Sequence, residues 1–239
     1  MGVMLRTALA AALLLWAGPS FAAEDANGYA NTGMSLDGIG KAYMGREIAQ
    51  VMGAAGAEWL ERPERVEEEG TDKVTPLLDL KPTDVVADIG AGTGYFSFRI
   101  AKLVPQGKVY AEDIQQEMLD IVAAKIKEGE AKNVVPVLGG VADPKLPANS
   151  VDLIIMVDVY HEFSYPREMG RAMVRALKPG GRIALLEYRA EDDSVPIKDV
   201  HKMSEAQVKK EMGAIGMAWV STDSKSLPWQ HLLIFKKAY

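Results

Sequence analysis

The chain has 239 residues, of which 48% are hydrophobic and 25% charged, with a net charge of -6 at pH 7 and no cysteine. This composition is typical of a globular protein and argues against a disordered chain, a collagen-like repeat or a coiled coil. The negative charge disfavours a nucleic-acid partner, because phosphate binding needs a basic field. Without cysteine there is no disulfide, thiol nucleophile or cysteine-bound metal.

Residues 1–22 have the three parts of a secretory signal peptide. Arg6 is the single charged side chain, an apolar run follows it, and small residues at Ser20 and Ala22 precede the expected cut after Ala22. The run is too short to span a bilayer. We therefore expect a periplasmic or secreted mature chain with no stable membrane span. The alternatives are an uncleaved anchor and a mis-assigned start, since Met4 is a second possible start.

Residues 23–73 are predicted to form a leader and a lid. Residues 23–36 are rich in Gly, Asn and Ser, which indicates a flexible segment. Apolar residues between Ile39 and Trp59 then recur near the helical period, which predicts a helix beginning after Asp37. The charge run at 61–69 is typical of a solvated helix face or a linker.

Residues 74–239 alternate between short apolar runs and amphipathic segments, and we expect them to form one domain. The alternation predicts an α/β fold with a doubly wound, Rossmann-like parallel sheet and helices on both faces. Strands are expected at 84–89, 108–111, 134–138, 151–157 and 182–186, helices at 95–104, 115–127, 166–178 and after the capping box Ser204-x-x-Gln207, and a final hairpin at 217–221 and 230–236.

A glycine turn, DIGAGTG at residues 88–94, follows the first of these strands. Ligands of such sheets bind at the carboxyl ends of the strands, and glycines let the backbone approach them closely. A dinucleotide fingerprint would need a glycine at Tyr95, and Asp88 would repel a pyrophosphate. Asp113 ends the second strand, where a carboxylate can accept bonds from ribose hydroxyls. The turn therefore favours a nucleoside with a cationic or zwitterionic tail over NAD.

In these residues the chain resembles the class I S-adenosylmethionine-dependent methyltransferases, in their small-molecule and ubiquinone-biosynthesis-like branch. The resemblance extends from about Val74 to the C-terminus and implies a seven-stranded, mostly parallel sheet whose last strand is antiparallel. The matching segments are DIGAGTG, YAEDI at 110–114, NSVDLIIM at 149–156, LKPGG at 177–181 and the closing STDSKSLPWQHLLIFKK.

The resemblance implies S-adenosylmethionine as the cofactor and assigns residues to it. The turn would wrap the methionine part, Asp88 would lie near its amino group, Asp113 would hold the ribose and Ile114 would pack on the adenine. Many relatives have an acid at the position of Val141, so the adenine edge is assigned here to Ala142 and Asp143. The full predicted set is Asp88, Gly90, Ala91, Gly92, Thr93, Gly94, Asp113, Ile114, Ala142, Asp143 and Asp158. A tight turn without a ligand is the alternative.

The acceptor side is expected just after the fourth strand. His161 is the candidate general base, Glu162 or Asp158 would orient it, and Tyr160 would contact the sulfonium. Alternatively, His161 caps a turn and Tyr160 only lines the pocket. The position that would complete an HExxH motif is Tyr165, so no metal site is predicted.

Other polar residues are weaker candidates. Those at the end of the fifth strand are as consistent with an exposed strand end as with acceptor binding, namely Glu187, Tyr188 and Arg189. His201 is expected on the surface, and His231 is expected to be structural. Tyr43 and Arg46 are lid candidates, although packing of a helix face is the favoured interpretation.

Two functions of different classes follow. The first is an exported methyltransferase that acts on a small-molecule or lipid-like acceptor. The second is a non-catalytic protein that binds a nucleoside or other small ligand on the same fold. Its support is the signal peptide, because the cofactor is made in the cytoplasm.

Overall fold

The computed structural model describes residues 23–33, 35–129 and 131–237. The signal-peptide prediction for residues 1–22 lies outside these ranges. Within the described residues, no helix has the length and apolar character needed to cross a bilayer.

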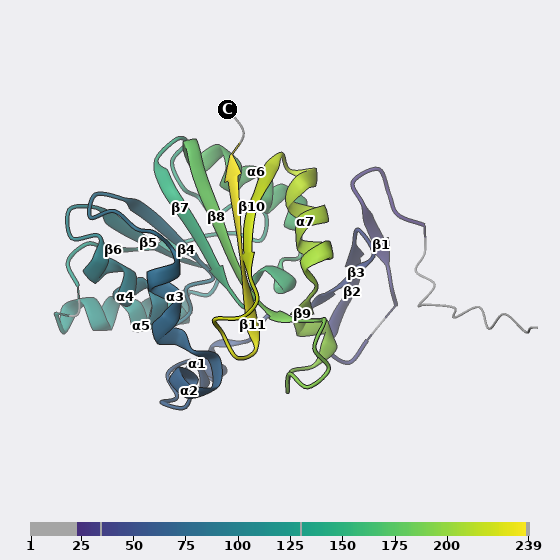
Figure 1. The fold of residues 1–239 in the computed structure, drawn as a ribbon, viewed down its shortest axis with the longest axis horizontal. Helices are drawn as coiled ribbons and strands as arrows, with labels where there is room; N and C mark the ends of the chain where they lie inside the picture. The colour runs from purple at the N-terminus through teal and green to yellow at the C-terminus, as the bar shows by residue number, and fades with distance from the viewer. Residues whose placement is uncertain (1–22, 34, 130, 238–239) are drawn as a thin grey trace, which may run out of the picture.

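The centre of the molecule is the predicted Rossmann-like sheet (Figure 1). Its main path runs in the order β10-β11-β8-β7-β4-β5-β6, and the two-residue strand β9 pairs with β8. β11 is antiparallel to both its neighbours, as the family resemblance implied. The strands are β4 (Val85–Ile89), β5 (Lys108–Asp113), β6 (Val134–Leu138), β7 (Val151–Val157), β8 (Leu177–Arg189), β9 (Lys202–Met203), β10 (Met217–Asp223) and β11 (Gln230–Lys237).

Side chains alternate along each strand between two apolar layers. Val86, Leu153 and Ala184 belong to one layer, which α3, α4 and α5 cover, whereas Ile154 and Ile183 belong to the other, beneath α6 and α7. The sheet is therefore buried on both faces, as near-continuous apolar runs such as VDLIIMV predict. The helices are α3 (Thr71–Leu77), α4 (Tyr95–Leu103), α5 (Gln116–Lys127), α6 (Pro166–Ala176) and α7 (Glu205–Ala214).

Local signals placed most of these elements correctly. Ser204 caps α7 by accepting a hydrogen bond from the backbone N–H of Gln207 at 3.2 Å, as the capping box predicted. β8 is longer than the predicted strand, because pairing with β7 begins at Leu177, before the glycines at 180 and 181.

The prediction of a helix after Asp37 is wrong. The segment forms an antiparallel sheet of β1 (Tyr29–Asn31), β2 (Gly38–Tyr43) and β3 (Arg46–Ala49). Met44 and Gly45, both with positive φ, form a two-residue turn between β2 and β3, the loop length typical of a hairpin. The leader is also structured, since its Tyr29 pairs with Tyr43.

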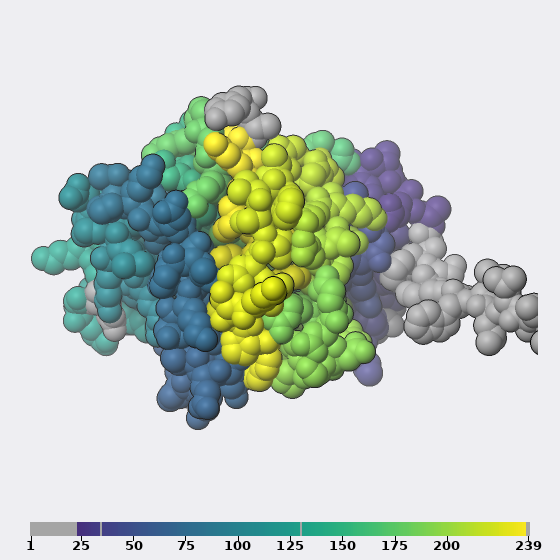
Figure 2. All heavy atoms as spheres, in the orientation of Figure 1, coloured from purple at the N-terminus to yellow at the C-terminus, as the bar shows by residue number. Residues whose placement is uncertain are grey.

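The N-terminal sheet packs at the edge of the domain, beside α7 (Figure 1). In the space-filling view the purple N-terminal segment lies against the green segments that follow β8 (Figure 2). Between this sheet and α3, the described residues form three short helical elements: η1 (Ala54–Gly56), α1 (Ala57–Leu60) and α2 (Arg65–Glu69). The charge run is not simply solvated, because Arg65 and Glu69 are buried and paired at 2.9 Å.

Candidate active site

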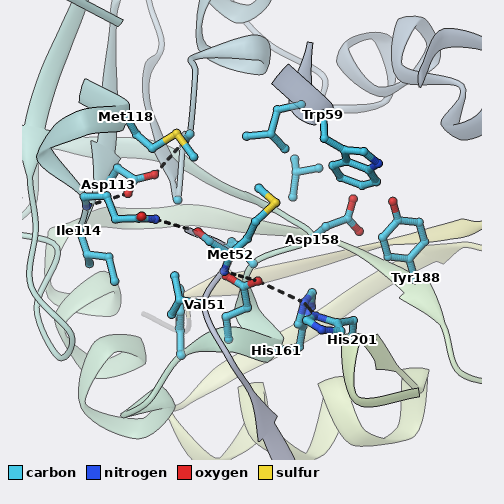
Figure 3. A pocket seen from close by; sticks show the side chains of 18 of the residues that line it. Val51, Met52, Trp59, Asp113, Ile114, Met118, Asp158, His161, Tyr188 and His201 are labelled. Atoms are coloured by element: carbon cyan, nitrogen blue, oxygen red, sulfur yellow. Dashed lines mark hydrogen bonds and ion pairs between the residues drawn. The ribbon is translucent and has the colours of Figure 1, made fainter. Parts of the chain in front are cut away.

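A cavity of about 390 Å³ opens at the carboxyl ends of β4, β5, β7 and β8. This is where ligands of doubly wound sheets bind. Asp113, Ile114 and Met118 lie at one end and His161 and His201 at the other (Figure 3). Its main lining residues are Val51, Met52, Trp59, Gly90, Gly92, Glu112, Asp113, Ile114, Met118, Val141, Asp158, His161, Glu162, Tyr188 and His201.

The glycine turn forms the floor of the first end. Gly90 and Gly92 line the cavity with positive φ angles of 68° and 54°. A Cβ atom on Gly90 would lie 2.3 Å from Cγ2 of Val159, so the chain has no room for a side chain there. The positive φ and the close packing both require glycine.

Asp113 holds this turn and faces the cavity. Its Oδ2 accepts the backbone N–H of Gly92 at 2.9 Å, and its Oδ1 accepts that of Gln115 at 2.9 Å. Each carboxylate oxygen has capacity for a further hydrogen bond. Burial raises the pKa of Asp113. The side chain is thus fixed in place with acceptor capacity directed at a ligand.

Two further carboxyl groups of the cavity wall have a buried oxygen without a hydrogen-bond partner among the described residues. These oxygens are Oε1 of Glu112, adjacent to Asp113 in the chain, and Oδ1 of Asp158, which lies toward Tyr188 in Figure 3. Burial raises the pKa of Glu112 to about 8 and that of Asp158 well above its usual range. Such groups gain from a cationic or hydrogen-bond-donating ligand. The cavity therefore suits a ligand with an amino group and a positive charge.

The second end is built around His161. Its Nδ1 lies 2.6 Å from Oε2 of Glu187, and the other oxygen of Glu187, Oε1, accepts the backbone N–H of Tyr160 at 2.9 Å. Its Nε2 lies 3.1 Å from Nδ1 of His201. Burial lowers the pKa of His161 to about 4, so the imidazole is neutral near pH 7. A neutral, oriented imidazole is able to accept a proton.

The expectation that His201 is a surface residue is wrong. The loop after β8 carries it into the cavity, where its ring stands edge-on to His161 with the centroids 5.0 Å apart. Glu187 likewise supports the site and is fully buried. Glu187 ends a predicted strand and His201 follows it, which placed both near the ligand-binding edge of the sheet. Their distance from His161 along the chain gave no indication that they contact it.

Several predicted cofactor residues do not line the cavity. Asp88 is buried and accepts a hydrogen bond from Ser97 Oγ at 2.6 Å. Thr93 is buried and donates to Glu61. Ala91 and Gly94 shape the turn, with Gly94 N–H bonded to the carbonyl of Ala91. These residues lie on the side of the turn that faces away from the cavity. Successive residues of the turn point to different sides, so only Gly90 and Gly92 line the cavity.

The adenine-edge and sulfonium assignments also need correction. Val141 lines the cavity, whereas Ala142 and Asp143 do not. Asp143 instead forms a small turn, its Oδ1 accepting the N–H of Lys145 at 2.8 Å. Tyr160 is fully buried among apolar residues beneath the site and is not part of the wall. Its ring therefore has no path to a sulfonium in the cavity.

Arg46 and Tyr43 are packing residues on the N-terminal sheet, not on a helix. The Arg46 guanidinium forms two hydrogen bonds to Glu211, at 2.8 and 3.0 Å, and donates to the carbonyl of His161 at 3.0 Å. Tyr43 is almost fully buried. His231, also buried, lies in β11 outside the cavity wall, as expected of a structural residue.

The cavity mouth is apolar. Val51, Trp59, Ile114 and Val141 line it and are each at least a third exposed. Trp59 and Val51 come from the segment after the N-terminal sheet. Ile114 and Val141 come from the loops that follow β5 and β6. Large apolar side chains that remain exposed around a cavity mark a binding surface for an apolar ligand.

Residues 86–181 match the family model described as "Methyltransferase domain". An uncharacterised methyltransferase-like protein of Schizosaccharomyces pombe is 31% identical over 134 residues, 56% of this chain and 49% of that protein. The ubiquinone/menaquinone biosynthesis C-methyltransferase of Ectopseudomonas mendocina is 32% identical over 114 residues, 47% of this chain and 44% of that protein. The chain spans about half the length of these curated relatives.

The fold is shared with a solved structure described as a SAM-dependent methyltransferase from Aquifex aeolicus. The TM-score is 0.74 at 25% sequence identity, over 79% of this chain and all of that one. Residues 86–181 thus match a methyltransferase-domain model, and they lie within the Rossmann-like fold that the sequence predicted and that the Aquifex aeolicus protein shares.

Proposed function

We propose that this chain, built on an S-adenosylmethionine-dependent methyltransferase domain, transfers a methyl group to a small, apolar or lipid-like acceptor. The observation that carries the proposal is the crevice between Gly90, Gly92 and Asp113, in a cavity that the unpartnered carboxyl groups of Glu112 and Asp158 also line. Its hydrogen-bonding and charge suit a nucleoside with a cationic tail and disfavour a diphosphate.

The residues of the first end fit the cofactor. Asp113 would accept bonds from the ribose hydroxyls, and Ile114 would pack on the adenine. The oxygens of Asp158 and Glu112 would receive the amino group and favour the positive charge. When bound, S-adenosylmethionine supplies a methyl group on a good leaving group. The chain's main task is then to place the acceptor in line with it and to exclude water.

His161 is proposed as the base that takes a proton from a hydroxyl or amine of the acceptor. Its contact with Glu187 fixes the ring and would stabilise the imidazolium after transfer. Glu162 lies at the same end, with its Oε1 4.0 Å from Nε2 of His161. Burial raises the pKa of Glu162 to about 7, so it is able to exchange the proton near neutral pH.

The acceptor class is inferred from Val51 and Trp59, the exposed apolar side chains of the cavity wall that the cofactor assignment leaves free. A lipid-like or aromatic molecule would bury these side chains, at about 25 cal/mol for each Å² of apolar surface removed from water. The curated relatives named for ubiquinone and menaquinone biosynthesis support this class.

Calorimetry with S-adenosylmethionine, S-adenosylhomocysteine and NAD tests the cofactor assignment. The wild-type chain is expected to bind the first two and not NAD. Asp113→Ala should weaken binding by at least about 100-fold, the loss of two hydrogen bonds to a charged group. Asp143→Ala, which removes an acid outside the cavity, is the matched control. Binding of NAD alone, or undiminished binding by Asp113→Ala, would refute the assignment.

Methyl transfer itself is tested with labelled cofactor and a cell-envelope extract, followed by identification of labelled products. His161→Ala should reduce turnover and leave cofactor affinity within a few-fold. Cofactor binding without any labelled product from this or a wider acceptor panel would favour the second candidate, a non-catalytic binding protein.

Export is part of the proposal and is supported by the sequence of residues 1–22. Cell fractionation and N-terminal sequencing test it. The expected product is a periplasmic or secreted chain that begins at Ala23. A full-length chain in the cytoplasm would overturn the export proposal and would remove the main support for a non-catalytic role.

A further inference from the structure

Three potential metal ligands converge at the second end of the cavity. His161, Glu162 and His201 each offer one ligand atom, and these atoms all lie within 4.8 Å of one another. His161 and Glu162 are adjacent in η2 (Tyr160–Glu162), and His201 ends η3 (Asp199–His201). All three residues line the cavity, and the two histidine rings are seen together in Figure 3.

The spacing of the two histidine nitrogens matches that of neighbouring ligands on one metal ion. Nε2 of His161 and Nδ1 of His201 are 3.1 Å apart. Two imidazole nitrogens bound at about 2.1 Å and at 90–109° to each other would lie roughly 3.0–3.4 Å apart. The nearest oxygen of Glu162, Oε1, is 4.0 Å from Nε2 of His161 and also accepts the backbone N–H of Met52 at 3.2 Å.

The supporting residues are those that a metal-bound histidine requires. Histidine ligands of metals usually donate their second ring N–H to a carboxylate, which fixes the ring and its tautomer. Glu187 lies 2.6 Å from Nδ1 of His161, is fully buried, and leaves Nε2 directed at His201. The backbone N–H of Tyr160 holds the other oxygen of Glu187 at 2.9 Å.

The charge around the cluster also favours a cation. The cavity wall contains the carboxyl groups of Glu112, Asp113, Asp158 and Glu162 against two basic residues, Arg65 and Lys198. Both basic groups already have acidic partners elsewhere, Glu69 and Asp37. Carboxyl groups thus outnumber unpaired basic groups in the cavity wall, which suits a divalent ion at the histidine pair.

We propose that His161, His201 and Glu162 form a binding site for one divalent first-row transition metal ion, such as Zn²⁺. Two nitrogen ligands and one oxygen ligand suit this class and disfavour Mg²⁺ or Ca²⁺, which prefer all-oxygen sites. Three protein ligands leave at least one coordination position open to the cavity. This inference rests on the proposed function: an acceptor hydroxyl oxygen would take that position, which makes a hydroxyl-bearing acceptor the substrate class. With the ion bound, Nε2 of His161 is a ligand and not the base, and the ion would instead lower the pKa of that hydroxyl.

The competing explanation is a hydrogen bond between two neutral histidines with no metal. A direct binding measurement separates the two. Tag-free protein is treated with a chelator, dialysed, and titrated with Zn²⁺ by calorimetry and with Co²⁺ by visible absorption. The expected result is one ion per chain, with Co²⁺ absorption bands typical of nitrogen and oxygen ligation.

His201→Ala is the main variant, because His201 is only half-buried and its loss should leave the fold intact. It should weaken Zn²⁺ binding by at least about 10–100-fold, as should Glu162→Gln. His231→Gln, which changes a histidine outside the cavity, should bind Zn²⁺ like the wild type. Circular dichroism checks that each variant is folded.

Absence of stoichiometric Zn²⁺ and Co²⁺ binding by the folded wild-type chain would overturn the metal site. Undiminished binding by His201→Ala would also overturn it. Calorimetry with S-adenosylmethionine on the same chelated protein reports on the proposed function separately. Cofactor binding without metal binding would therefore refute this inference alone, and metal binding without cofactor binding would refute the proposed function alone.

Discussion

The two ends of the cavity are built in different ways. The end that contains Asp113 comes from consecutive strand-end residues, and its main contacts join positions about 20 apart, such as Gly92 to Asp113. The end that contains His161 depends on distant segments. Glu187, His201 and Arg46 reach it from positions 26, 40 and 115 residues away. Contacts between neighbouring strand ends thus form the first end, whereas the second end forms only when three distant parts of the chain pack against His161.

This difference predicts how each end responds to substitutions elsewhere in the chain. The first end should tolerate changes elsewhere, because the glycine turn is held by the strands beside it. The second end should be sensitive to the packing of the N-terminal sheet, since Arg46 joins that sheet to both Glu211 and the carbonyl of His161. Four predictions test this contrast, from the largest expected effect to the smallest.

Arg46→Met should destabilise the chain by about 3–5 kcal/mol, because it leaves the buried Glu211 without its charged partner. Chemical denaturation measures the loss, and turnover should fall more than cofactor affinity. The double variant Arg46→Met/Glu211→Met should recover most of the stability. Lys178→Met, which breaks a partly exposed pair with Asp152, should cost less than about 1 kcal/mol. A loss by Arg46→Met as small as that of Lys178→Met would contradict the proposed dependence on the N-terminal sheet.

Glu112→Gln should stabilise the ligand-free chain at high pH. Burial, and then the neighbouring Asp113, raise the pKa of Glu112 to about 8. Between pH 4.5 and 8 the unfolded chain therefore releases a proton that the folded chain keeps, and stability falls as pH rises. Glutamine does not ionise, so the variant avoids this loss. Its free energy of unfolding should exceed that of the wild type by roughly 2–4 kcal/mol at pH 8–9 and by little at pH 5.

Thermal unfolding across this pH range measures the difference. The exposed Glu117→Gln, on α5, controls for the change in net charge. The same Glu112→Gln change should weaken S-adenosylmethionine binding, because a glutamine cannot ionise when a cationic ligand binds beside it. An advantage of Glu112→Gln that does not grow with pH would show that Glu112 ionises freely in the folded chain.

Ser97→Ala should lower stability by about 1–2 kcal/mol, because it leaves a buried oxygen of Asp88 without its hydrogen-bond donor. Cofactor affinity should stay within about two-fold of the wild type, since neither residue lines the cavity. Denaturation and calorimetry on one sample test both statements. A large loss of affinity with unchanged stability would restore Asp88 as a direct ligand of the cofactor.

Val141→Asp should tighten S-adenosylmethionine binding by about five-fold, or ~1 kcal/mol, the contribution of one added hydrogen bond. Val141 lines the cavity at the edge that the resemblance assigns to adenine. Val141→Asn separates hydrogen bonding from charge, and calorimetry provides the comparison. Weaker binding by both variants would indicate that this edge holds the apolar acceptor and not the adenine.

Most of the fold could be predicted because its signals are local. The strand at 151–157 is a continuous apolar run, and Ser204 caps its helix with its own side chain. Prediction failed at the N-terminal sheet, where Ile39, Tyr43 and Ile48 are close to a helical period. The Met44–Gly45 turn was the better signal, because a two-residue loop with positive φ joins antiparallel strands and has no place inside a helix.

The amino-acid sequence by itself determined the alternating fold, the glycine turn and the position of Asp113, because each depends on neighbours along one strand and the turn after it. Only the tertiary structure decided that Asp88 and Tyr160 point away from the cavity and that His201 and Glu187 join His161. Whether a side chain faces a cavity depends on the elements packed around it. Contacts between segments 26 to 165 residues apart, such as Arg46 with Glu211, have no periodic trace in the sequence.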